Sequence, residues 1–193
     1  MCKMNFVKVA CLIFCALLFY QPIQAQSSNL RINGTVSTVG GRFPGRSFPF
    51  SLIVKNYTSP GQVSELNAAL QRGDDEMLSV LSRMSAGRIQ LGTGVGIPAN
   101  AIIADPWGDG GTKITVLYER NLSFFELRAG TRSTDYRFGY AEMFLDARGR
   151  GQGTLIGAAR VRLRSGNTWE VEDFGTFPAR LLGLRSSGRV LPR

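Results

Sequence analysis

From Arg88 to Phe174 the apolar residues tend to recur at every second position, in short runs separated by turn-forming residues. This spacing is typical of β-strands that have one face on a core and the other face in solvent. The turn signals include Asp105-Pro106, Asp109-Gly110-Gly111 and Gly166-Asn167. Because short connections favour antiparallel pairing of consecutive strands, we expect a meander in which each strand pairs with its neighbours in the chain.

Two further strands are predicted before this region. Leu30–Val39 alternates over part of its length, and Phe48–Tyr57 is a more apolar run that indicates a buried strand. The strands predicted from residue 88 onward are Arg88–Gly96, Ala99–Ala104, Thr112–Glu119, Leu122–Arg128, Tyr136–Asp146, Gly153–Arg164 and Thr168–Phe174. A chain of 193 residues with this pattern is expected to form one sheet-rich domain.

Between the second and third predicted strands the apolar period becomes helical. Ser59-Pro60 indicates a helix start, since serine caps helices and proline is tolerated in the first turn. The predicted helices are Pro60–Arg72 and Asp74–Ser85, the second opening with acids that suit the positive end of the helix dipole. The expected fold is a single α+β domain. Its antiparallel β-meander curls into a sandwich or partly open barrel, and the helical pair (about residues 60–86) is inserted after the second strand.

The first residues have the layout of a secretory signal peptide. Lys3 and Lys8 form a basic segment, residues 9–20 are apolar, and Gln21–Ala25 ends the run with a small residue. The apolar run is shorter than the ~18 residues of a membrane-spanning helix, and we expect no transmembrane segment after cleavage. We predict a signal peptide over residues 1–25, an exported periplasmic or extracellular domain over residues 26–184, and a basic tail over residues 185–193.

Two residue types that carry much of enzyme chemistry are missing or confined to the N-terminus. The chain has no histidine, and its three cysteines are Cys2, Cys11 and Cys15. This excludes Ser-His and Cys-His triads, and cleavage would also remove every thiol ligand and every disulfide. We therefore expect neither a cofactor nor a metal site, and the composition favours a protein that is not an enzyme.

The formal net charge is +9, which suits an anionic partner. The acidic residues are interspersed with the basic ones, and the recognised nucleic-acid-binding motifs are missing, so no specific nucleic-acid partner is expected. The clearest basic feature is Arg160, Arg162 and Arg164, which alternate with apolar residues and so share one face of a predicted strand.

The strand that carries these arginines is predicted to form a hairpin with the next strand, and this hairpin weakens the anion-binding interpretation. A three-residue loop at Ser165–Asn167 keeps the apolar residues of both strands on one face. The resulting pairs are Leu163 with Trp169, Arg162 with Glu170, Val161 with Val171 and Arg160 with Glu172. Two of the arginines would then meet glutamates across the strands, which favours a self-neutralised surface.

The segment from Asp105 to Gly111 reads as a tight acidic loop with an aromatic residue. Asp105 and Asp109 could hold calcium, and Trp107 could stack on a sugar ring, although the spacing does not match an EF-hand loop. The weak candidate binding residues are therefore Asp105, Trp107, Asp109, Arg160, Arg162 and Arg164, for a glycan or an anionic ligand.

These features predict an exported, non-catalytic binding or structural module at the cell envelope or outside the cell. One alternative is a glycosidase-like hydrolase that uses carboxylates alone, drawn from Glu119, Glu126 or Glu142. Another is a barrel-type carrier of an apolar ligand. Its cavity would be lined by aromatic residues from Phe124, Phe125, Tyr136, Phe138, Tyr140 and Phe144.

Overall fold

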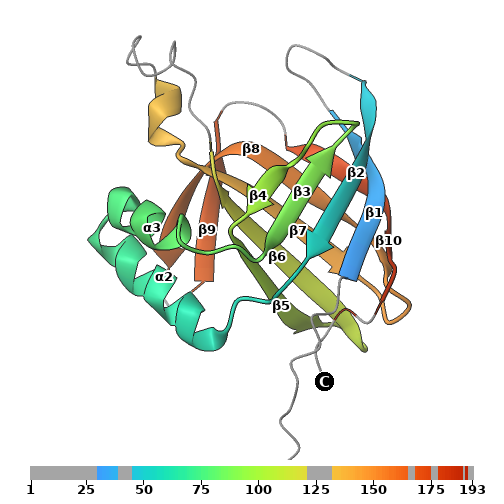
Figure 1. Ribbon diagram of the computed structural model, residues 1–193, viewed down its shortest axis with the longest axis horizontal. Helices are drawn as coiled ribbons and strands as arrows, with labels where there is room; N and C mark the ends of the chain where they lie inside the picture. The colour runs from blue at the N-terminus through green and yellow to red at the C-terminus, as the bar shows by residue number, and fades with distance from the viewer. Residues whose placement is uncertain are drawn as a thin grey trace, which may run out of the picture.

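The structure of the protein is a computed structural model (Figure 1). It describes residues 30–38, 45–120, 132–164, 168–174, 178–188 and 190. The predicted signal peptide and the predicted strand Leu122–Arg128 lie outside these residues. The elements in chain order are β1 (Leu30–Ser37), β2 (Ser47–Val54), α2 (Pro60–Arg72), α3 (Asp74–Leu81), β3 (Gly87–Leu91), β4 (Ile97–Ala99), β5 (Ala101–Trp107), β6 (Gly111–Glu119), the 3-10 helix η1 (Arg132–Asp135), β7 (Phe138–Leu145), β8 (Arg150–Arg164), β9 (Thr168–Asp173) and β10 (Ala179–Ser186).

The helical pair forms where the sequence signals predict it. Ser59 and Gln62 make a reciprocal capping box, in which each side chain accepts a hydrogen bond from the backbone N–H of the other residue. Helix α3 ends at Leu81 rather than at the predicted Ser85. The chain tightens there, because the N–H groups of Arg83 and Met84 bond to carbonyls three residues back.

The strands form one antiparallel sheet with the order β4-β3-β2-β1-β10-β8-β7-β6-β5, and β9 pairs with β8 beside this path. The order is meander-like, but the consecutive strands β4 and β5, and likewise β9 and β10, do not pair, and two pairs join strands that are not consecutive. Strand β1 pairs with β10, and β8 pairs with β10 as well as with β9. Strand β8 accommodates both partners because its first part pairs with β10 and residues 159–164 pair with β9.

Strand β10 is not predicted by the alternation of its residues. Its fully buried side chains, Leu181 and Leu184, lie three positions apart, and strict alternation would place them on opposite faces. The pairing register shifts between these leucines, and Gly183 has a φ of 59°, in the left-handed region that favours glycine. This bulge inserts one extra residue, so that both leucines reach the same core.

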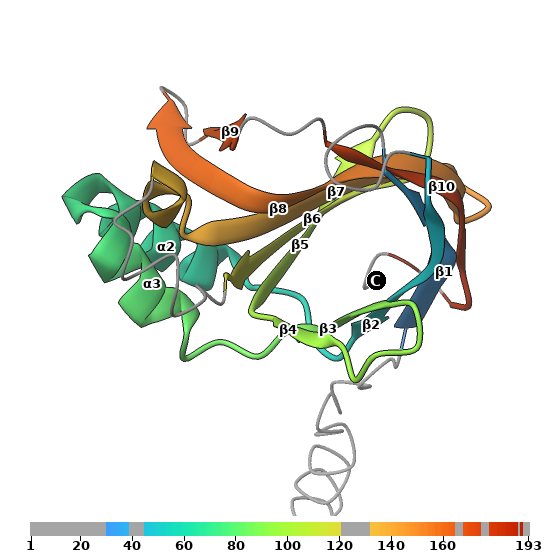
Figure 2. The same cartoon turned by 90° about the horizontal axis from the view of Figure 1, so that it is seen from above.

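Viewed from above, the sheet curls on itself into a partly open barrel (Figure 2). The two ends of the strand path, β4 and β5, are consecutive in the chain, with only Asn100 between them. One core is built by strands from all around the curl, and its largest fully buried side chains are Leu30, Ile32, Phe50, Leu52, Ile89, Ile102 and Ile114. Side chains therefore fill the inside of the barrel.

A second core lies between the helical pair and the outer face of the sheet. The helices contribute Leu66, Leu70, Met77 and Leu81, and the strands contribute Leu117, Phe138, Ile156 and Val161 among others. This packing places the helices over one end of β5–β8, as Figure 2 shows. The other end of these strands lies away from the helices (Figure 2), and one of the candidate binding residues, Trp107, is the last residue of β5.

The C-terminal segment is bound to the sheet further than expected. Strand β10 continues to Ser186, and Ser187 exchanges hydrogen bonds with the backbone of Arg31. The carbonyl of buried Val190 accepts a hydrogen bond from the Tyr57 hydroxyl. Residues 185–188 and Val190 therefore belong to the domain rather than to a tail. None of the helices in the described part of the chain combines the length and apolarity needed to cross a bilayer.

Candidate functional site

The β8–β9 hairpin has the predicted backbone register. Leu163 lies opposite Trp169, and Arg162 lies opposite Glu170. The apolar face of the hairpin packs toward α2, where the indole N–H of Trp169 donates to the Asn67 side-chain oxygen at 2.7 Å. The alternation of apolar and charged residues is therefore sufficient to predict how this hairpin pairs.

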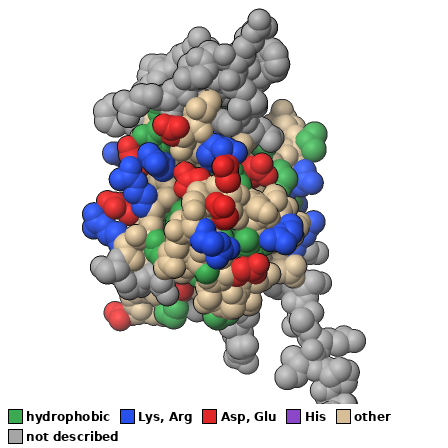
Figure 3. All heavy atoms as spheres, turned by 90° about the vertical axis from the view of Figure 1, so that its left-hand side faces the viewer, with side chains coloured by type: hydrophobic (Ala, Val, Ile, Leu, Met, Phe, Trp, Pro, Cys, Tyr) green, Lys and Arg blue, Asp and Glu red, His purple; other side chains and the backbone are tan. Residues whose placement is uncertain are grey.

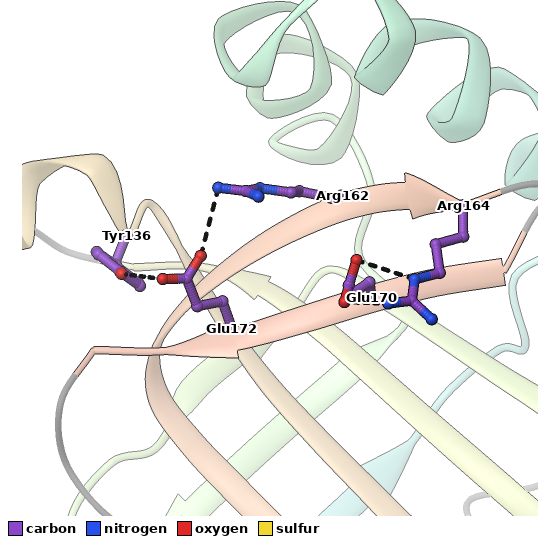
Figure 4. A network of polar contacts seen from close by, with 5 residues as sticks. All are labelled: Tyr136, Arg162, Arg164, Glu170 and Glu172. Carbon is purple, nitrogen blue, oxygen red and sulfur yellow. Dashed lines mark hydrogen bonds and ion pairs between the residues drawn. The ribbon is translucent and has the colours of Figure 1, made fainter.

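The ion pairs of the hairpin differ from the predicted ones (Figure 4). Glu172 binds Arg162 at 3.5 Å, and Glu170 binds Arg164 at 2.7 Å, so each pair is diagonal rather than directly across. Strand twist and long side chains bring the diagonal positions into reach. Glu172 also accepts a hydrogen bond from the Tyr136 hydroxyl at 2.7 Å, which anchors this end of the hairpin.

Arg160 has no ion pair within the described residues, contrary to the predicted contact with Glu172. It lies between two shallow pockets of about 400 and 510 Å³ that share Arg160 and Asp74. Burial raises the pKa of Asp74, while the charges of Arg160 and Arg137 act in the opposite direction. Figure 3 shows basic and acidic side chains interspersed on this helix-bearing side. The arginine row is largely neutralised by neighbouring carboxylates, which weakens it as an anion site.

The predicted acidic loop is shorter in the structure than in the sequence interpretation. Asp105, Pro106 and Trp107 belong to β5, and only residues 108–110 form the turn into β6. The backbone pairs Asp105 with Lys113 and Trp107 with Gly111, so the two aspartates do not share a loop. Within the described residues no group of three or more His, Cys, Asp or Glu side chains is arranged to hold a metal ion.

Trp107 and Asp109 do come together, at a shallow pocket of about 340 Å³. Trp107 is 51% exposed, and its ring packs against Phe144 with the ring centroids 4.6 Å apart and the planes tilted by 54°. Asp109, Asp146, Arg150 and Gln152 supply polar groups around these two rings. The turn that carries Arg150 is held by Asp146, whose carboxylate accepts two backbone hydrogen bonds at 2.8 Å. We call this site the Trp107 pocket.

The sequence interpretation missed Phe144, Arg150 and Gln152 as members of this site. Their placement follows from the β5–β8 register, in which Asp105, Lys113, Phe144 and Gln152 form one row across four strands. The sequence shows that Lys113 and Phe144 each alternate with inward-facing apolar residues on their own strand. It does not show that these two strands pair with each other. Asp105 lies in this row but does not line the pocket.

A polar cluster follows the same outer face. Glu142 forms an ion pair with Lys113 at 2.6 Å and accepts a hydrogen bond from the Tyr140 hydroxyl at 3.1 Å. Burial, together with the Glu142 charge, raises the pKa of Tyr140 above its ordinary value. Glu142 is thus held as a paired carboxylate.

Two carboxylates considered for hydrolysis are far apart. Glu142 lies opposite Thr115, and Glu119 is four positions further along β6, which corresponds to about 13 Å. Glycosidase carboxylates lie about 5–9.5 Å apart. The third candidate, Glu126, lies outside the described residues.

The aromatic residues considered for an apolar carrier do not line one cavity. Phe138 and Tyr140 are buried under the helices, whereas Phe144 lies beside Trp107 on the outer surface. Tyr136 contacts Phe174 with the ring centroids 4.9 Å apart. Phe124 and Phe125 lie outside the described residues.

A larger pocket, which the sequence does not indicate, lies near the bend between β4 and β5. Its volume is about 610 Å³, and it is lined by Ser82, Met84, Ser85, Ile97, Pro98, Asn100, Tyr118, Glu119, Arg120 and Gly157. Asn100 joins its walls, because the side chain accepts from the Glu119 N–H at 3.0 Å and donates to the Met84 carbonyl at 3.2 Å. We call this site the Tyr118 pocket.

Comparison of the chain with protein-family models, with curated proteins and with solved structures found no match.

Proposed function

We propose that this protein is an exported, non-catalytic binding module whose ligand is a glycan held at the Trp107 pocket. The observation that carries the proposal is the exposed Trp107 ring, supported from the side by Phe144. An aromatic face is electron-rich and attracts the C–H groups on the flat side of a sugar ring. A fixed, half-exposed indole is therefore a suitable platform for a saccharide.

The surroundings of the ring supply the polar groups that a sugar requires. Asp109 offers a hydrogen-bond acceptor, Arg150 offers donors, and Gln152 offers both. The pocket is shallow, at about 340 Å³, which suits one or two sugar units of a longer chain rather than an enclosed small molecule. The signal-peptide pattern of residues 1–25 supports a role where envelope or extracellular polysaccharides are present.

The alternatives have less support. A carboxylate hydrolase needs two convergent acids, and Glu119 and Glu142 are about 13 Å apart along their strands. A carrier of an apolar ligand needs an enclosed apolar cavity, whereas the aromatic residues considered for it do not line one cavity, and the Tyr118 pocket combines an apolar wall with polar groups.

The test is affinity electrophoresis and pull-down of the purified protein with peptidoglycan, chitin, cellulose, xylan and dextran. We expect retention by at least one of these polysaccharides. Trp107→Ala should weaken that binding about tenfold or more, because the stacking platform is removed. Phe48→Ala is the matched control, since Phe48 is another exposed aromatic residue (40% exposed) and lies on β2.

Equal binding by the wild type and Trp107→Ala, or no retention by any of the polysaccharides, would contradict the proposal. Release of reducing sugars that Glu142→Gln abolishes would instead support the hydrolase alternative. Tryptophan emission gives a second readout, because the only other tryptophan, Trp169, is hydrogen-bonded to Asn67 under α2.

A further inference from the structure

The Tyr118 pocket contains a polar group that the fold leaves without a partner. Tyr118 is the last inward-facing residue of β6 and is only 6% exposed. Its hydroxyl makes no hydrogen bond to any described residue. The hydroxyl is not one of the fully buried side-chain atoms that lack a partner among the described residues, so it opens onto the pocket, where it can donate to a bound ligand.

Two glycines create the space around this phenol. Gly139 lies opposite Tyr118 in the β6–β7 pairing, and a side chain at Gly139 would overlap the Tyr118 ring. Gly157 lies at the irregularity of β8 beside β7 and also lines the pocket. A Cβ atom placed at Gly157 would meet no other atom within 4 Å. The ring of Tyr118 therefore lies across Gly139, and the space at Gly157 remains open.

The rest of the lining has two chemical halves. Met84, Ile97 and Pro98 form an apolar wall. Burial raises the pKa of Tyr118 to about 12, and the positive charge of Arg120 acts in the opposite direction. Arg120 also lines the pocket, and its guanidinium donates to the Tyr136 carbonyl at 3.3 Å. Glu119 is exposed at the rim, since strand alternation turns it away from the inward side of Tyr118.

We propose that the Tyr118 pocket binds a small aromatic carboxylate, with the aromatic body on the Met84–Ile97–Pro98 wall and the carboxylate on the Tyr118 hydroxyl and the Arg120 guanidinium. A protonated phenol donates to a carboxylate, and a guanidinium adds a charge-assisted contact. The volume of about 610 Å³ lies within the range of small-molecule sites. The pocket is separate from the Trp107 pocket, because Trp107 and Tyr118 lie at opposite ends of the β5–β6 hairpin.

The experiment is calorimetric titration of the purified protein with 2-naphthoate, with methyl 2-naphthoate as the uncharged probe. We expect saturable binding of the acid and clearly weaker binding of the ester. Tyr118→Phe should weaken the acid about tenfold or more, since it removes one hydrogen bond to a charged group and keeps the ring. Gly157→Leu should abolish binding by filling the open space, and Gly61→Leu on α2 is the matched control.

Three results would overturn the proposal. They are no saturable binding of 2-naphthoate, equal binding of the acid and the ester, and unchanged binding by Gly157→Leu. Amide chemical shifts of the wild type give a readout that needs no variant, and they should change at Ile97, Ala99 and Asn100, at residues 118–120 and at Gly157. Trp107→Ala should leave 2-naphthoate binding unchanged, so the glycan proposal and this one can fail independently.

Discussion

At the scale of single residues, Asn100 shows how one side chain can hold distant parts of the fold together. It is 7% exposed and lies between β4 and β5, the two ends of the strand path. Its side chain bonds to the carbonyl that follows α3 and to the N–H at the end of β6, while its own carbonyl accepts from Ala86. These contacts compensate for the missing backbone pairing between β4 and β5.

Replacing Asn100 by alanine should therefore destabilise the protein by about 2 kcal/mol or more, because the Met84 carbonyl and the Glu119 N–H both lose their partner. The measurement is the free energy of unfolding in guanidinium chloride. Gln90→Ala is the control, since it removes a single exposed hydrogen bond to the Gly94 carbonyl and should cost under about 0.5 kcal/mol. Equal costs for the two variants would show that Asn100 does not join the two ends.

At the scale of elements, β10 connects the first strand to the C-terminal half of the sheet. It lies between β1 and β8, and it supplies Leu181 and Leu184 to the barrel core. Its bulge at Gly183 gives these residues a spacing of three, which the period-two pattern of a regular strand does not contain. The chain thus encodes β10 through one special backbone conformation rather than through alternation.

This account makes a prediction for three neighbouring leucines. Leu181→Ala and Leu184→Ala should each cost about 2–4 kcal/mol of unfolding free energy, because both side chains are fully buried. Leu182→Ala should cost under about 1 kcal/mol, since Leu182 is 42% exposed. Denaturant unfolding of the three variants measures the free energy that each substitution costs and so ranks them. A larger cost for Leu182 than for Leu184 would mean that the bulge is not at Gly183.

At the scale of the whole molecule, the described domain makes no use of cysteine. The three cysteines of the chain all precede residue 16, and the described residues are held by two hydrophobic cores. A domain stabilised in this way can fold in an oxidising or in a reducing compartment.

We expect the full chain, expressed in a secretory bacterial host, to lose its first 25 residues and to begin at Gln26. Intact mass of the purified protein and cell fractionation measure this. A variant that lacks residues 2–25 is the control and should stay in the cytoplasm. Recovery of the full-length chain with Met1 in the cytoplasm would contradict both the signal peptide and the proposed site of action.

The sequence alone determined the local structure of this protein. The capping box at Ser59 set the start of α2, and the alternation of arginines and glutamates set the β8–β9 register, because both depend on residues close together in the chain. The sequence also indicated that Trp107 and Asp109 belong to one candidate site, because the two residues lie in the same short hairpin.

Only the tertiary structure decided the long-range features. The β1–β10 pair, the contact of Phe144 with Trp107 and the placement of Gly139 and Gly157 around Tyr118 depend on which distant strands become neighbours. Residue periodicity states which face a side chain takes, but it does not state which strand lies beside it. That choice follows from closing the whole sheet around its core, so the larger pocket appears only when the chain is folded.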